Sequence, residues 1–359
     1  MKVTPRSEIE GLQRPAHGGI VESELTRFGI TPEEVIDFST NTNPFGPPES
    51  VLHAIQRTRI DRYPDRSLYR LRSVIAETEG VLPEEVLPTS GVSQLIWLIA
   101  LAFLHPSDTV AIVGPTFGEY EVASQIMGAK VERYLAPAEE NFKLDLQRVV
   151  AFLTDIQPKV IWLCNPNNPT GSYLLLEELR LLYDSAPDSL FVLDEAYLRF
   201  LRDAESPAGW QRLIKMRSLT KDYNIPGLRL GYALAARDTI EALSKVQPPW
   251  SVSAIAQEAG IAAIQDNEFL ERTVGALQEE AGRLKVRLAR QGWRVLPSPM
   301  HYFLVETEDA AELRQRLLTE HQILVRDCVS FGLPRHIRVS TRLSEENDLL
   351  ANVMNVLAE

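Results

Sequence analysis

The chain has 359 residues, enough for about two domains, and its 45% hydrophobic and 24% charged residues are typical of a globular protein. A formal net charge of −12 argues against nucleic acid as a partner, because a phosphate backbone calls for a basic face. Two cysteines are too few for a disulfide framework or a cysteine-based metal site, and the absence of a signal-like or long apolar run predicts a cytoplasmic chain that does not enter a membrane.

The first 45 residues are predicted to form an arm that lies over another part of the protein. Residues 1–20 are polar and then rich in glycine, ending in Ala16-His17-Gly18-Gly19. Residues 37–48 contain too many turn formers for a regular helix. Local chemistry alone explains Asn41 and Asn43 as Asx-turn residues, and a functional role is the alternative.

The next part predicts two helices and an aromatic loop between them. Helices are expected at residues 48–58 and 67–80, the second because its apolar residues share one face. The loop Arg62-Tyr63-Pro64-Asp65 carries a ring that can point into a partner subunit.

From residue 86 to residue 246, strands and helices alternate, which predicts an α/β fold with a mostly parallel sheet and crossover helices. Strands are expected at 86–89, 109–113, 160–164, 190–193, 213–216 and 229–234. Helices are expected at 94–104, 174–184 and 238–246.

Two features of this region are candidates for ligand contacts. Ser90-Gly91-Val92-Ser93 is a turn of small residues that leads into a helix, and the N–H groups and dipole of a helix N-terminus favour an anion. Many strand–helix turns share this pattern, so its specificity alone is low. Phe117, after the next strand, is either a core residue or a ring stacked on a flat heterocycle.

Two more candidates follow buried strands, at the edge where open α/β sheets bind ligands. The strand at 160–164 leads into Asn165-Pro-Asn-Asn168-Pro-Thr-Gly171. The strand at 190–193 leads into Asp194-Glu-Ala-Tyr197. An acid at the end of an apolar strand loses hydration unless it is paired, so Asp194 either has a cationic partner or caps a helix.

The residues from Ser218 to Arg229 point to one chemistry. Lys221 follows an apolar strand together with two hydroxyl residues, Ser218 and Thr220, and Arg229 comes after a Pro-Gly turn. A lysine that forms a Schiff base with a phosphate-bearing aldehyde uses such a set, because hydroxyl groups and a guanidinium can hold the phosphate. A single loop lysine is usually only solvated, so this prediction depends on the other motifs as well.

The remaining residues predict a smaller α+β domain that covers the ligand edge of the sheet together with the arm. Helices are expected at 254–265 and 267–291, the second long enough to link two domains. Strands at 302–306, 323–326 and 336–342 then alternate with helices at 309–320 and from 344 onward. The predicted boundaries are 1–45 for the arm, 46–250 for the large domain, and 251–359 for the linking helices and small domain.

In this order the motifs resemble those of the fold-type I enzymes that depend on pyridoxal 5′-phosphate, the aspartate aminotransferase superfamily. The resemblance spans essentially the whole chain. Ser-Leu-Thr-Lys221, Ile-Pro-Gly-Leu-Arg229, Asn-Pro-Asn-Asn168-Pro-Thr-Gly and Arg-Tyr63-Pro-Asp are most similar to the branch of histidinol-phosphate aminotransferases and threonine-phosphate decarboxylases. The resemblance implies a large three-layer domain, a small α+β domain, and a homodimer in which Tyr63 reaches the cofactor of the other subunit.

The resemblance also implies a role for each motif residue. Lys221 would form the Schiff base, Asp194 would keep the pyridine nitrogen protonated, and Tyr197 would bind the ring oxygen, and these three would be the catalytic residues. The other cofactor contacts would come from Asn168 at the ring oxygen, Phe117 over the ring face, and Ser90, Gly91, Val92, Ser218, Thr220, Arg229 and Tyr63 at the phosphate.

Three features resemble the decarboxylase more than the aminotransferase. They are His17-Gly-Gly in the arm, Pro-Pro-Trp250-Ser-Val-Ser, and a tail with two arginines. Ile20 replaces the asparagine that follows His-Gly-Gly in the decarboxylase, and the loop from Cys328 to Ile337 is short, so both positions depart from its pattern. The residues implied to bind L-threonine O-3-phosphate, a precursor of the cobalamin side chain, are His17, Asn41, Asn168, Arg326 and Arg338.

The alternative is an aminotransferase, such as one that moves an amino group from histidinol phosphate to 2-oxoglutarate. The two reactions differ in which bond of the substrate's α-carbon is held perpendicular to the cofactor ring: C–H for transfer and C–COO⁻ for decarboxylation. A cofactor-binding protein without turnover is a third hypothesis, and the complete set of Lys221, Asp194 and Arg229 argues against it.

Overall fold

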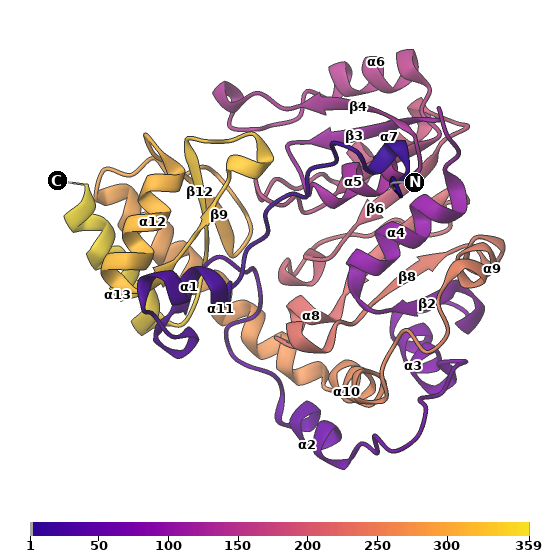
Figure 1. The fold of residues 1–359 in the computed structure, drawn as a ribbon, viewed down its shortest axis with the longest axis horizontal. Coiled ribbons are helices and arrows are strands. Elements are labelled where there is room, and N and C mark those ends of the chain that lie inside the picture. The colour runs from indigo at the N-terminus through magenta and orange to yellow at the C-terminus, as the bar shows by residue number, and fades with distance from the viewer. Residues whose placement is uncertain (1–2, 359) are drawn as a thin grey trace.

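A seven-stranded sheet is the centre of the larger part of the computed structural model, which describes residues 3–358 (Figure 1). In spatial order the strands are β2 (Val86–Thr89), β8 (Gly231–Ala235), β7 (Leu213–Ser218), β6 (Leu190–Asp194), β5 (Val160–Cys164), β3 (Thr109–Gly114) and β4 (Lys130–Leu135). In this order the five strands from β7 to β4 run parallel, and β8 is antiparallel to both of its neighbours. The mostly parallel sheet predicted from the sequence is therefore confirmed.

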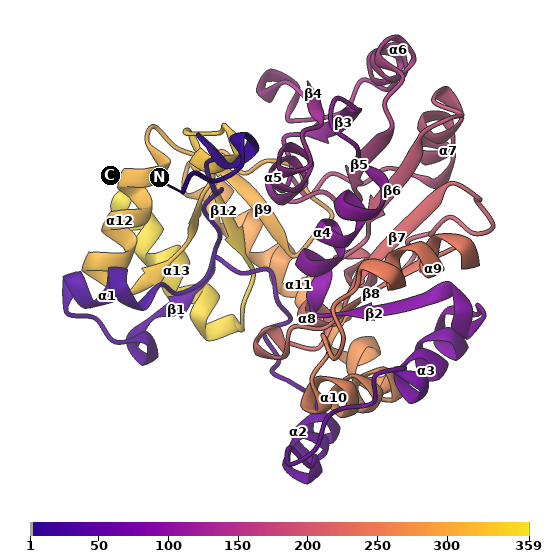
Figure 2. The ribbon, with the colours of Figure 1, turned by 45° about the vertical axis from the view of Figure 1, so that its right-hand side comes forward.

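Helices cover both faces of this sheet, because both faces are apolar. Val110 and Ile112 of β3 point into one core, whereas Ala111 and Val113 point into the other. This alternation along a strand produces two cores and hence three layers, which Figure 2 shows from the side. The first core includes α4 (Gly91–Phe103), α5 (Glu119–Ile126) and α9 (Arg237–Val246), and the second includes α6 (Leu146–Ile156) and α7 (Leu176–Ser185).

A further group of helices packs at the β2 end of the sheet. Val51, Leu71 and Ala259 are buried there around Val86 and Tyr232. The helices are α2 (Glu49–Arg57), α3 (Tyr69–Glu79) and α10 (Ala254–Gln265).

A second, smaller sheet lies beside the first and is antiparallel throughout. Phe303, Val305, Ile337 and Val339 on one face of this sheet form a core with the helices that cover it. Arg338 lies on the opposite face of this sheet, which is turned toward the large domain. The elements are β11 (Arg326–Asp327), β12 (His336–Ser340) and β9 (Tyr302–Glu306), with α11 (Asn267–Arg290), α12 (Ala310–His321) and α13 (Ser344–Leu357). The proposed domain boundaries stay a prediction.

The N-terminal segment contacts both parts of the molecule. β1 (Ile36–Asp37) pairs in parallel with β10 (Ile323–Leu324), and Leu25 of α1 (Glu22–Phe28) packs against Leu318 and Leu324. Nearer its beginning, the segment reaches the large domain, where Arg6 donates a hydrogen bond to the carbonyl of Ile126. Figure 1 shows this segment, in indigo, running between the two parts.

Several elements differ from the prediction. The sequence analysis assigns no element to the residues of α5, β4 and α6, and β4 shows why: it is an edge strand with three charged residues and lacks an apolar run. Residues 323–326, expected as one strand, divide at Val325, because β10 pairs with β1 and β11 pairs with β12. Lys221 lies in the short helix α8 (Leu219–Asp222) directly after β7.

No helix within residues 3–358 is both long enough and apolar enough to cross a bilayer. The cytoplasmic location stays a prediction.

Candidate active site

A cavity of about 320 Å³ opens between the two sheets, at the carboxyl ends of the parallel strands. Asp194 and Ser218 come to its wall from the ends of β6 and β7, because parallel strands end at the same edge. Arg326 and Arg338 come from the small sheet, and residues 16–18 come from the N-terminal segment. The cavity therefore lies at the edge where the sequence analysis expects a ligand.

Most of the predicted site residues line this cavity, although they are far apart in the sequence. Ser90, Gly91 and Tyr63 are the predicted residues that do not line it. Those that do are His17, Asn41, Val92, Phe117, Asn168, Asp194, Tyr197, Ser218, Thr220, Lys221, Arg229, Arg326 and Arg338.

Lys221 is partly buried, and its side chain borders the cavity. Burial, helped by the positive charges of Arg338 and Arg229, lowers the pKa of Lys221 to about 8. Asn43 fixes the helix that carries it, since the Asn43 backbone N–H donates to the carbonyl of Lys221 (3.0 Å) and its side chain donates to that of Asp222 (3.1 Å). Asn43 is thus a structural residue, and its Oδ1 accepts from the N–H of Phe45 (3.2 Å) in an Asx turn.

Asp194 is a buried carboxylate without a cationic partner among the described residues. Its Oδ2 accepts a hydrogen bond from the hydroxyl of Tyr120 (2.6 Å), and its Oδ1 accepts one from the N–H of Ala196 (3.0 Å). Burial raises the pKa of Asp194 to about 6, and the hydrogen bond from Tyr120 opposes that shift. A site with this carboxylate is suited to a ligand that brings a positive charge.

One corner of the cavity is built for an anion. Among the described residues, the side chain of Arg229 makes one hydrogen bond, from Nη1 to the carbonyl of Pro226 (3.0 Å), and its guanidinium lies next to Gly91. Gly91 has a φ of +78°, and a Cβ there would come within 2.9 Å of Nη2 of Arg229, so only glycine fits. Ser218 and Thr220 add two hydroxyl groups, 2.7 Å apart. Ser90 does not contribute its N–H, because Gln94 Oε1 accepts that bond (2.8 Å).

The opposite end of the cavity carries two arginines. Arg326 and Arg338 are paired directly across β11 and β12, and each side chain is about 5% exposed or less. Arg338 donates to Asn168 Oδ1 and to the carbonyl of Ser39. Arg326 donates from Nη2 to the carbonyl of Ala16 (2.6 Å) and to Ser330 Oγ (2.5 Å). The two positive charges are thus held side by side in the small domain.

His17, Phe117 and Asn41 also line the cavity. The His17 ring is 5.5 Å from the ring of Phe117, and its Nε2 is 2.9 Å from Oε1 of Glu119. Phe117 lines the cavity and also packs against the core, and its stacking on a flat heterocycle stays a prediction. Within residues 3–358, neither polar atom of the Asn41 amide has a hydrogen-bond partner although the residue is buried, which is expected of a group that binds a ligand.

Tyr63 is 77% exposed and lies away from the cavity of its own chain, with its ring centre 4.7 Å from that of Trp250 and tilted by 31° to it. Sequence reasoning missed Tyr120 and Ser39, which also line the cavity. A signal for Tyr120 was present, because it lies three residues after Phe117, in the segment that follows the buried strand β3. Ser39 acts through its backbone carbonyl, which leaves no signal in the sequence.

The residues present fit pyridoxal 5′-phosphate. When protonated, the ring nitrogen of that cofactor is a cation that can pair with the Asp194 carboxylate. The cofactor's phosphate matches the corner formed by Arg229, Ser218 and Thr220. Lys221, whose pKa is lowered, borders the same cavity and can react with the cofactor's aldehyde.

The comparisons with known proteins agree with this fit. The model of the family "Aminotransferase class I and II" matches residues 33–353. A histidinol-phosphate aminotransferase of Caldicellulosiruptor saccharolyticus is 32% identical over 333 residues, which cover 88% of this chain and 89% of that protein. The structure of a histidinol-phosphate aminotransferase from Sinorhizobium meliloti in complex with pyridoxal-5′-phosphate has a TM-score of 0.87 at 25% identity, covering 98% of this chain and 96% of that one.

A structure of L-threonine-O-3-phosphate decarboxylase from Porphyromonas gingivalis has a TM-score of 0.79 at 29% identity, covering 89% of this chain and 98% of that one. Aspartate aminotransferases are also among the similar structures, which confirms the predicted fold. Because the curated relatives carry the name histidinol-phosphate aminotransferase, the comparisons favour the alternative of the sequence analysis over the decarboxylase. With the family model matching most of its length, the chain belongs to the class I and II aminotransferases, enzymes that depend on pyridoxal 5′-phosphate.

Proposed function

We propose that this protein moves an amino group from a small phosphorylated donor, such as histidinol phosphate, to 2-oxoglutarate. The observation that carries the proposal is the pair Arg326 and Arg338, directly opposite each other on neighbouring strands. Like charges in that arrangement destabilise a sheet, so the pair calls for anions to offset its repulsion. The phosphate of the donor and the carboxylates of the acceptor are such anions, and the relatives' name supports histidinol phosphate as the donor.

The other end of the cavity would hold pyridoxal 5′-phosphate, which supplies a conjugated ring that draws electrons from the substrate's α-carbon. Asp194 would keep a proton on the ring nitrogen, because a buried carboxylate is stabilised by a cationic partner. Arg229 would bind the phosphate by charge-assisted hydrogen bonds. The remaining contacts would come from Ser218, Thr220 and the N–H of Val92 to the phosphate, Tyr197 and Asn168 to the ring oxygen, and Phe117 to the ring face.

Lys221 would bind the cofactor's aldehyde and then move the proton of the substrate's α-carbon through its Nζ atom. A general base is most effective when its pKa lies near the working pH. The pKa of about 8 leaves a substantial fraction of Lys221 unprotonated near neutral pH. This proton transfer is the step that distinguishes amino-group transfer from loss of carbon dioxide.

A decarboxylase acting on L-threonine O-3-phosphate is the second candidate. The observation that favours it is the place of His17 and Asn41, which line the cavity next to the two arginines as the resemblance to that enzyme implies. The decarboxylase from Porphyromonas gingivalis has the same fold.

Product analysis of the cofactor-loaded protein separates the two candidates. With histidinol phosphate and 2-oxoglutarate we expect glutamate to accumulate. With L-threonine O-3-phosphate and no acceptor we expect no carbon dioxide. The reverse pattern would replace the first candidate with the second, and no turnover with either mixture would reject both substrates.

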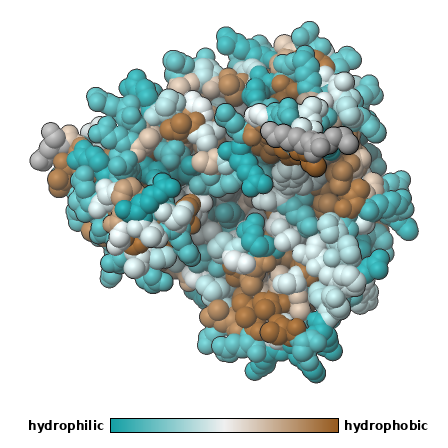
Figure 3. Space-filling view, viewed as in Figure 1, coloured by the Kyte–Doolittle hydropathy of each residue, from teal (hydrophilic) through white to brown (hydrophobic). Residues whose placement is uncertain are grey.

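We also propose that two copies of the chain share their active sites. Tyr63 lies outside the cavity of its own chain and is exposed, as are Leu52, Ile60 and Tyr69. Figure 3 shows hydrophobic surface gathered at the lower edge of the molecule, where α2 lies in Figure 1. Apolar surface that is continuous and exposed marks an interface, so Tyr63 would reach the cofactor phosphate of the other subunit.

Mixed dimers test the sharing. In a hybrid of Lys221→Ala and Tyr63→Phe subunits, one site is intact if Tyr63 acts across the interface. Activity is then expected to reach about a quarter of the wild-type value, because half of the randomly mixed dimers are hybrids with one intact site each. Activity no higher than that of the two parent variants together would reject the shared site.

A further inference from the structure

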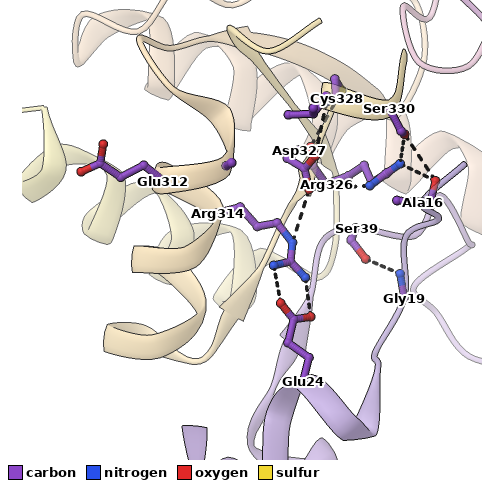
Figure 4. Close-up of polar contacts among 12 residues, drawn as sticks. Ala16, Gly19, Glu24, Ser39, Glu312, Arg314, Arg326, Asp327, Cys328 and Ser330 are labelled. Atoms are coloured by element: carbon purple, nitrogen blue, oxygen red, sulfur yellow. Dashed lines mark hydrogen bonds and ion pairs between the residues drawn. The ribbon is translucent and has the colours of Figure 1, made fainter. Parts of the chain in front are cut away.

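A row of alternating charges runs from the surface helix α1 to Arg326 in the cavity wall (Figure 4). Glu24 of α1 accepts two hydrogen bonds from Arg314 of α12, one on each carboxylate oxygen and each 2.7 Å long. Nε of Arg314 lies 3.6 Å from Oδ2 of Asp327, and Nη1 of Arg326 lies 3.6 Å from the same oxygen. One carboxylate is therefore shared by two guanidinium groups, one at the cavity and one outside it.

The other contacts of Arg326 show why the sharing of the Asp327 carboxylate affects ligand binding. Its Nη2 donates to a carbonyl oxygen of Ala16 and a hydroxyl of Ser330, both of them neutral acceptors. Within the described residues, Asp327 is the only acid that comes within 4.0 Å of Arg326. The attraction between Arg326 and a bound anion is therefore weaker when Asp327 pairs closely with Arg326, and stronger when Asp327 pairs with another cation.

Arg314 is that other cation, because it attracts the Asp327 carboxylate from outside the cavity. The side chains of Arg314, Asp327 and Glu24 are 20%, 19% and 29% exposed, so the solvent screens their interactions only in part. The pair with Glu24 uses Nη1 and Nη2 of Arg314, whereas its Nε faces Asp327, so the two carboxylates share one guanidinium.

We propose that Arg314 is a positioning residue for the substrate's anion: it competes with Arg326 for the Asp327 carboxylate and so keeps the Arg326 guanidinium available to the anionic group of the substrate. The inference rests on the proposed function only in the role that it gives to Arg326. It also gives α1 a part in substrate binding, because Glu24 competes with Asp327 for Arg314.

The proposal predicts effects of alternating sign along the row. Arg314→Gln leaves Asp327 entirely to Arg326, so anion binding weakens by roughly threefold to fivefold, as for a partly exposed ion pair. Asp327→Asn removes the competing carboxylate, so binding tightens by a similar factor. Glu24→Gln also tightens binding, by a smaller factor, because Glu24 is farther away and acts through Arg314. A merely structural row would weaken binding in all three variants, since each variant loses a link between α1 and β11.

Calorimetric titration of the cofactor-loaded full chain with inorganic phosphate measures these effects without relying on turnover. Arg326→Gln is the reference variant. If phosphate binds equally to this variant and to the wild type, Arg326 is not the anion site and the proposed function fails. If Arg326→Gln weakens binding but Arg314→Gln does not, the inference fails and the proposed function stands.

A double variant and a matched control complete the test. Arg314→Gln is expected to have little effect when Asp327→Asn is already present, because no carboxylate is left to compete for. An undiminished effect of Arg314→Gln in that background would overturn the proposal. Arg316→Gln, on the same helix and paired with Glu320 at 3.5 Å, is expected to bind phosphate like the wild type. Should Arg314→Gln fail to fold, the absence of tightening in Asp327→Asn alone would overturn the proposal.

Discussion

The two ends of the cavity are built in different ways. The cofactor end takes Asp194 and Ser218 from adjacent strands of one parallel sheet and Lys221 from the short helix that follows. The substrate end joins the N-terminal segment to Arg326 and Arg338 of the small sheet, which are about 300 residues away in the sequence. Backbone hydrogen bonds of the large sheet hold the first end, whereas the second depends on how separate segments pack together.

This difference explains how one fold accommodates several reactions. The cofactor end can stay constant while the substrate end changes through its own segments, without disturbing the sheet. One family model therefore spans most of the chain, while the similar structures include both an aminotransferase and a decarboxylase.

The largest effect is expected at the cofactor end. Lys221→Ala should lower kcat by at least about 10²–10⁴-fold, the contribution of a single acid–base group. Lys245→Ala is the control, because Lys245 is exposed on α9 and pairs only with Glu241 among the described acids. Steady-state kinetics with the substrates proposed above provides the measurement, and turnover close to wild type in Lys221→Ala would contradict its role.

The same lysine should reduce the stability of the cofactor-free protein. Its folded pKa of about 8 lies below the unfolded value of 10.5, so between these pH values the unfolded state binds more protons and stability rises with pH. Lys221→Met should therefore stabilise the cofactor-free protein near pH 7, by about 2 kcal/mol after allowance for partial exposure. Urea unfolding at several pH values measures both effects. A rise in stability between pH 8 and 10.5 that is as steep in the variant as in the wild type would show that another group causes it.

At the substrate end, Arg338→Gln should raise KM for the anionic substrate by about tenfold to a hundredfold, because a buried charge-assisted hydrogen bond is lost. Arg335→Gln is the matched control, since Arg335 is 64% exposed near the start of β12 and its acid partner is Glu306. Initial rates over a range of substrate concentrations separate KM from kcat. Equal KM values for Arg338→Gln and Arg335→Gln would remove Arg338 from the anion site.

The smallest effect is expected for Tyr120→Phe. Loss of the hydrogen bond from Tyr120 should raise the pKa of Asp194 further, so that Asp194 becomes protonated at a higher pH and activity is lost earlier on acidification. At neutral pH we expect a decrease of up to about tenfold, and at alkaline pH almost none. The pH profile of kcat measures the shift, with Tyr134→Phe on the edge strand β4 as the control. If the acidic side of the pH profile is the same in Tyr120→Phe and in the wild type, the hydrogen bond from Tyr120 does not lower the pKa of Asp194.

The contrast between the two ends also decides what could be predicted from the sequence. Lys221 and Asp194 follow apolar strands, and the chemistry of their neighbours is visible within a few residues. Arg326 and Arg338 could be assigned only through the resemblance, because nothing local shows that β11 and β12 lie opposite each other. The division at Val325 could not be predicted at all, since an apolar run does not show which of two sheets will bind each half.

The pairing of β1 with β10 has a consequence for the order in which the protein is made. Residues 36 and 37 leave the ribosome early, but their partners, residues 323 and 324, are synthesised about 15–60 s later at ordinary rates. Leu318 and Leu324, against which Leu25 packs, are also synthesised at that late stage. All the residues of the cofactor end are already translated by then, so the nascent chain completes its cofactor end first and its substrate end last. Contacts this distant in sequence also fold slowly, which leaves Leu25, Ile36 and Asp37 without these partners during most of synthesis.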